Sequence, residues 1–133
     1  MKYLFMIALF CATLLANDLG WSHDYNEAVE KSKKSKKLIY TLITSDDCRW
    51  CRKFEETTLT NKDILKRLYS EFEVVQISRD QHKVPLGFAS SPVPRHYFTD
   101  SNGKILYSSL GHRDLECFFS FMDNAQEKQK VTK

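Results

Sequence analysis

The chain has 133 residues, of which 42% are hydrophobic and 28% are charged, and its formal net charge is +3 at pH 7. This length predicts one domain with a hydrophobic core and leaves little room for a second domain. The basic excess is too small to indicate a nucleic-acid-binding protein, so we expect no nucleic-acid partner.

The first sixteen residues have the pattern of a secretory signal peptide. Lys2 precedes an apolar run from Tyr3 to Leu15, and the small residue Ala16 stands at the expected cleavage site. The run is shorter than the roughly 20 apolar residues that cross a bilayer, and an uncleaved anchor is the alternative. We therefore predict a signal peptide over 1–16, a domain over 17–126 and export, with the bacterial periplasm as the expected compartment.

A helix and then a buried strand are predicted after this leader. Apolar and small residues recur at helical spacing from Trp21 to Lys36, and Ser22 is the expected N-cap. The run from Leu38 to Thr44 is apolar and contains β-branched residues. It therefore predicts a central strand that is buried on both faces.

Two cysteines three residues apart follow this strand. Cys48 and Cys51 enclose Arg49 and Trp50 at the start of an expected helix, for which segment 45–47 supplies the capping candidates. Residues at i and i+3 share one helix face, so the two sulfurs can bond without backbone movement. The helix N-terminus favours a thiolate at the first cysteine. Cys48 is the predicted nucleophile and Cys51 the resolving thiol, because so short a loop adds little stability as a structural bridge.

Further elements are expected in the second half of the chain. They are helices over 61–72 and 114–126 and strands over 72–78, 95–99 and 104–108. The Asn102-Gly103 pair predicts an antiparallel hairpin between the last two strands. The last helix has a predicted inner stripe of Leu115, Phe118, Phe119, Met122 and Ala125. The charged segment 127–133 is expected to be a flexible tail, and the whole order predicts an α/β fold with a mixed sheet between helices.

The ordered set of motifs resembles the thioredoxin superfamily, and more closely its exported members and the C-terminal domain of the bacterial reductant conductor DsbD. Segment 47–55 around the cysteines, Val93-Pro94 before a strand and Gly111 before the last helix carry this resemblance. It implies a thioredoxin fold with an extra N-terminal helix. It also implies a cis bond before Pro94, with the Val93 backbone free to pair with substrate; an ordinary trans proline is the alternative.

One position departs from that resemblance. Many relatives carry a buried acid six residues before the first cysteine, where this chain has Leu42. Glu55 lies four residues after Cys51 on the same helix face and matches the glutamate of the DsbD-like pattern. It is the predicted proton acceptor, and a surface glutamate paired with Arg52 or a lysine is the alternative.

The resemblance also implies the chemistry and its partners. The predicted activity is thiol-disulfide exchange on protein substrates, in the direction of reduction, with a membrane-bound electron donor. An oxidase or isomerase, or a non-catalytic binding module, is the alternative. Separately from the resemblance, we expect the protein to be a monomer. Arg49 is expected to tune the redox potential, and Trp50 either contacts substrate or covers the disulfide.

Three histidines and a cysteine outside the Cys48–Cys51 pair suggest other possible roles. No metal and no other cofactor is predicted, because no histidine has an i, i+4 histidine partner, as a zinc site on a helix would need. The histidines in question are His82, His96 and His112. Cys117 lies off the predicted stripe and is expected to be a buried, inert thiol, with dimerisation through it as the alternative.

Overall fold

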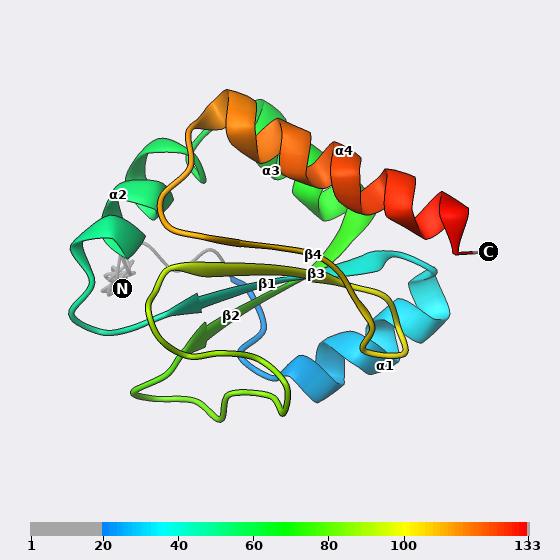
Figure 1. The fold of residues 1–133 in the computed structure, drawn as a ribbon, viewed down its shortest axis with the longest axis horizontal. Coiled ribbons are helices and arrows are strands. Elements are labelled where there is room, and N and C mark those ends of the chain that lie inside the picture. Colours follow the sequence, from blue (N-terminus) through cyan, green and yellow to red (C-terminus); the bar gives the residue numbers. More distant parts are fainter. Residues whose placement is uncertain (1–19, 133) are drawn as a thin grey trace, which may run out of the picture.

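The computed structural model describes residues 20–132 of the chain (Figure 1). The predicted signal peptide, residues 1–16, lies outside this range. Within it, no helix combines the length and the apolar character that crossing a membrane requires.

Four strands form one mixed sheet with helices on both faces, as the order of elements predicted (Figure 1). The helices are α1 (Tyr25–Ser35), α2 (Arg49–Thr57), α3 (Lys62–Glu71) and α4 (Leu115–Val131). The strands are β1 (Leu38–Thr44), β2 (Phe72–Ser78), β3 (Arg95–Thr99) and β4 (Ile105–Leu110). The order in the sheet is β2-β1-β3-β4; β1 is parallel to β2 and antiparallel to β3, and β4 is antiparallel to β3.

Strand β1 is the centre of the fold, and all seven of its residues are buried. Successive side chains point to opposite faces of a strand, so β1 contributes to two hydrophobic layers. Tyr40 and Leu42 face α2, α3 and α4, whereas Ile39 and Ile43 face α1. This two-sided burial is what the continuous apolar run of β1 predicted.

Helix α1 begins later than the sequence predicted. Its N-cap is Asp24, whose carboxylate accepts hydrogen bonds from the N–H groups of Asn26 and Glu27. The predicted cap, Ser22, instead forms a parallel bridge with Val75 of β2. The backbone at Ser22 thus pairs with the open edge of the sheet, although local propensity favoured a helix there. The predicted start of the helix at Trp21 was wrong.

Helix α4 runs to Val131, five residues beyond its predicted end, so most of segment 127–132 is helical. Its buried side chains are Phe118, Phe121, Met122 and Ala125. The predicted stripe missed Phe121 and wrongly included Leu115, which is exposed. Both stripes have helical spacing, because residues 118–122 are nearly all apolar, and packing on the sheet decides between them. Strand β4 also begins and ends later than the predicted range 104–108.

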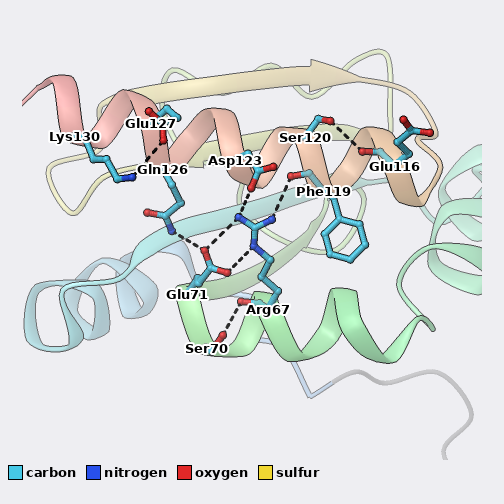
Figure 2. Close-up of polar contacts among 10 residues, drawn as sticks. All are labelled: Arg67, Ser70, Glu71, Glu116, Phe119, Ser120, Asp123, Gln126, Glu127 and Lys130. Carbon is cyan, nitrogen blue, oxygen red and sulfur yellow. Dashed lines mark hydrogen bonds and ion pairs between the residues drawn. The ribbon is translucent and has the colours of Figure 1, made fainter.

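A cluster of ion pairs joins α3 to α4 on the surface (Figure 2). The Arg67 guanidinium lies 2.6 Å from the carboxylate of Glu71 on its own helix and 2.6 Å from that of Asp123 on α4. It also donates to the backbone oxygen of Phe119, and Gln126 donates to Glu71. Arg67 is therefore the one described residue that binds acidic groups of both helices at once.

Replacing Arg67 with alanine is expected to lower the free energy of unfolding by about 1 kcal/mol, the upper end for partly exposed pairs. The side chain is 23% exposed but Asp123 is 64% exposed, so solvent screens part of the interaction. Urea denaturation measures the change. Lys130→Ala is the control, because its pair with Glu127 is exposed on both sides and lies within α4; an equal shift in both variants would contradict the prediction.

Candidate active site

Cys48 and Cys51 form a disulfide at the start of α2, with their Cα atoms 5.2 Å apart. Cys48 is itself the N-cap of the helix, and its sulfur accepts a hydrogen bond from the Cys51 N–H at 3.1 Å. After reduction the same donor would face the Cys48 thiolate, which is the form that attacks disulfides. Cys48 is 8% exposed and Cys51 2%, so Cys48 is the more accessible of the two residues.

The capping role predicted for segment 45–47 was wrong, since the first cysteine takes it. Asp46 is directed to the end of β2 instead, where its carboxylate accepts hydrogen bonds from Ser78 and Gln81 at 2.7 Å each. Its backbone N–H is bound by Asp80. These contacts hold the loop between β1 and α2 in place. The two hydrogen bonds also stabilise the negative charge of the Asp46 carboxylate.

Trp50 forms the exposed edge of the site, with 49% of its surface accessible. The cationic groups of Arg49 and Lys53 lie over its ring, at 5.6 Å and 5.1 Å from the centroid. The His112 ring stacks on it with centroids 6.3 Å apart. Arg49 and Trp50 were predicted from the spacing of the cysteines, whereas Lys53 and His112 were not predicted as neighbours of Trp50.

The Val93–Pro94 peptide bond is cis, as predicted, and the Ser91–Pro92 bond is also cis. Pro94 immediately precedes β3, whose first residue pairs with Ile43 near the end of β1. The cis bond and the loop that leads to Cys48 therefore lie at the same end of the sheet. Pro94 is buried and Val93 is partly exposed, and their contact with substrate stays a prediction.

Glu55 lies on α2, one turn after Cys51, and is half-buried. Burial and the neighbouring Glu56 raise the pKa of its carboxyl group, and Arg52 opposes them in part. The Glu55 charge also contributes to the raised pKa of Tyr40, whose first cause is burial. Glu55 thus lies near the buried layer behind the disulfide, with a pKa moved towards that of a proton acceptor at neutral pH.

A family model described as thioredoxin-like matches residues 20–101. The chain belongs to the thioredoxin-like family. With the disulfide between Cys48 and Cys51, this membership supports thiol-disulfide oxidoreductase activity at the level of the family. The family match also confirms the predicted thioredoxin fold and the predicted resemblance to the thioredoxin superfamily.

Solved structures of thioredoxin fold resemble the chain over most of its length. The DsbH oxidoreductase is 22% identical with a TM-score of 0.66, over 84% of this chain and 87% of that one. The oxidised C-terminal domain of DsbD from Neisseria meningitidis is 14% identical with a TM-score of 0.62, over 79% and 98%. At these identities the likeness shows the fold.

One curated relative is much longer than this chain. Spermatogenesis-associated protein 20 of Homo sapiens is 29% identical over 65 residues, which make up 49% of this chain and 8% of that protein. The shared part is therefore a small portion of the human protein.

Replacing Glu55 with glutamine is expected to slow the resolution of the mixed disulfide about tenfold at neutral pH, less than a fully buried base contributes, because water reaches Glu55. Stopped-flow measurement of product release over a range of pH tests this role. Glu30→Gln is the control, since Glu30 is an exposed glutamate on α1 and does not contribute to the raised pKa of Glu55. An unchanged rate in Glu55→Gln across the pH range would remove Glu55 from the mechanism.

His96 is a residue of this thioredoxin-like fold whose importance the sequence did not reveal. It is fully buried and lies opposite Leu42 in the pairing of β1 with β3. Burial is the main cause that lowers the pKa of its imidazole to about 4. The available signal was a histidine within a predicted strand, next to Tyr97 and Phe98.

The histidines considered for metal binding make other contacts. The Nδ1 atom of His82 accepts a hydrogen bond from the Ser78 N–H, and its ring stacks on His23 with centroids 4.3 Å apart. Within residues 20–132, no three His, Cys, Asp or Glu side chains gather as a metal site would require.

The third cysteine of the described chain does not occupy the position that was predicted. Cys117 is exposed in the first turn of α4, where the buried thiol was expected. Its N–H donates to the N-cap Asp114, and the Asp114 charge is the main cause that raises the pKa of the thiol. A raised pKa leaves less thiolate at neutral pH, so Cys117 is a poor competitor of Cys48 as nucleophile.

Proposed function

We propose that this protein is an exported thiol-disulfide oxidoreductase that reduces disulfides in protein substrates. The observation that carries the proposal is the Cys48–Cys51 disulfide at the N-terminus of α2, where Cys48 caps the helix beside an exposed Trp50. A dithiol in this position has a nucleophile, a resolving thiol on the same helix face, and an apolar surface for a peptide.

The proposed reaction proceeds in two exchange steps. The Cys48 thiolate attacks one sulfur of the substrate disulfide, which releases the other substrate sulfur as a thiolate and leaves a mixed disulfide. The Cys51 thiolate then attacks the Cys48 sulfur, releases the second substrate thiolate and closes the Cys48–Cys51 bond. The substrate gains two electrons, and protons from solvent or from Glu55 complete its thiols. A membrane-bound thiol donor returns the enzyme to the dithiol form.

The reducing direction rests on the resemblance of segment 47–55 to the DsbD subgroup, and the reduction potential measured against glutathione tests it. We expect a value near that of thioredoxin, about −270 mV, and far from about −120 mV, the value of the strong oxidant DsbA. A value near the second figure would make the protein a donor of disulfides. Light scattering of the same sample tests the proposed monomer.

Export is proposed from the charged, apolar and small-residue pattern of residues 1–16. The full chain is expressed in a bacterium, and the mass of the periplasmic product is measured. We expect a species that lacks residues 1–16. Recovery of the uncut chain from the cytoplasm would contradict export.

A further inference from the structure

A buried chain of hydrogen bonds runs from β1 through β3 to the loop before α4. The Tyr40 hydroxyl lies 2.7 Å from Nδ1 of His96, and Nε2 of His96 lies 2.8 Å from the backbone oxygen of Gly111. Tyr40 and His96 are both fully buried. The His96 ring also packs edge-on against Phe54 of α2, with centroids 4.8 Å apart.

The partners of His96 determine the position of its proton. A carbonyl oxygen can only accept, so Nε2 must carry the hydrogen that it donates to Gly111. In a neutral ring Nδ1 is then an acceptor, and the Tyr40 hydroxyl donates to it. Of the two neutral tautomers, only Nε2–H satisfies both nitrogens, and the burial that lowers the pKa of His96 favours the neutral ring over the charged one.

Gly111 is the point at which this chain reaches the surface. Its N–H donates to the backbone oxygen of Pro94 at 2.8 Å, so Gly111 is bound on one side by the cis-proline segment and on the other by His96. The next residue, His112, stacks on Trp50. The following backbone oxygen, that of Arg113, accepts from Thr58 at the end of α2. The segment 111–113 therefore connects the cis-proline strand to the helix that carries the disulfide.

We propose that His96 is a positioning residue of the active site, which holds the Gly111 carbonyl and thereby fixes His112 against Trp50 at the substrate-docking edge. His96 acts on this edge through the backbone and has no part in the bond exchange at sulfur. The inference rests on the proposed function, because it assigns the exposed edge to docking of protein disulfides.

Two amide variants separate the bonds that His96 makes. Glutamine reaches about as far as Nε2 and can still donate to Gly111, whereas asparagine reaches only as far as Nδ1 and loses this bond. His96→Asn is expected to lower kcat/KM for insulin, a protein disulfide, about tenfold and mainly through KM, as one lost buried hydrogen bond would. His96→Gln should stay within about threefold of wild type. Both variants should reduce hydroxyethyl disulfide at the wild-type rate, because this small molecule needs no docking edge.

The stacking partner supplies an independent arm. His112→Ala should lower kcat/KM for insulin as His96→Asn does, and the double variant should add little to either change, because both remove the same contact. Equal losses in the asparagine and glutamine variants, or additive losses in the double variant, would overturn the proposal. So would an equal loss on insulin and on hydroxyethyl disulfide, which would indicate a damaged dithiol.

A measurement on the unaltered protein keeps the test valid even if a variant does not fold. The ¹⁵N shifts of the His96 ring should show the neutral Nε2–H tautomer down to about pH 5, as its partners require. The other tautomer would overturn the proposal. Failure of the proposed function looks different, since wild type would then reduce neither insulin nor hydroxyethyl disulfide.

Discussion

Replacing Cys48 with serine is expected to lower the rate of protein disulfide reduction at least about 10³-fold, as the loss of a catalytic nucleophile does elsewhere. Serine has the same shape but no thiolate, and it cannot form the mixed disulfide. The measurement is insulin reduction by the full chain with dithiothreitol as the electron source. The control is Cys117→Ser, which removes an exposed free thiol that has no part in the Cys48–Cys51 disulfide and should leave the rate unchanged.

The complementary variant tests the order of the two cysteines. In Cys51→Ser the Cys48 thiolate can still attack, but no second thiol resolves the product, so mixed disulfides should accumulate and disappear on treatment with dithiothreitol. Trapping by Cys48→Ser instead would reverse the assignment. If neither variant trapped a partner, and the double variant bound partners as wild type does, the protein would be a binding module of thioredoxin fold.

Lowering the pH from 7.5 to 5 is expected to cost wild type about 2 kcal/mol more of its free energy of unfolding than it costs His96→Gln. The pKa of His96 is about 4 in the folded protein, against 6.5 for an unperturbed histidine. Between these values the unfolded chain binds a proton that the folded chain does not. Stability therefore falls as the pH falls through 6.5 towards 4, and it is restored at neutral pH.

Other groups titrate in the same range, and the comparison with His96→Gln removes their effect. Burial lowers the pKa of His82 and of His112, so both also favour the folded state at higher pH. The raised pKa of Glu55 acts in the opposite sense, since the folded protein holds its proton more tightly than the unfolded chain. All three groups are present in both proteins. Urea denaturation at the two pH values gives the difference, and equal losses in both proteins would show that His96 is not buried in a neutral state.

Local pattern was sufficient for the central part of the fold. The continuous apolar run of β1 predicted its central, two-sided burial, because a strand can be apolar on both faces only where both are covered. The spacing of Cys48 and Cys51 predicted that the sulfurs could pair, since residues at i and i+3 share a helix face. The resemblance added the cis bond before Pro94, and the role that it implies for Glu55 stays a prediction.

Helix boundaries and faces were less well determined, because several local choices were nearly equal. Ser22 and Asp24 can both cap a helix, and the open edge of β2 decided between them by taking Ser22 into a bridge. Leu115 and Phe121 both fit an apolar stripe on α4, and the contact of α4 with the sheet buried Phe121. The exposure of Cys117 follows from the same choice of face.

The sequence by itself determined the central chemistry of the candidate site, two thiols at the start of a helix, and its resemblance to the thioredoxin superfamily added the cis proline. Tertiary structure decided what surrounds that chemistry. Tyr40, His96 and Gly111 are far apart in the chain, and only strand pairing brings them into one buried network. The contact of His112 with Trp50 likewise joins two distant segments. Such contacts depend on how the elements pack, and they leave no periodic signal in the sequence.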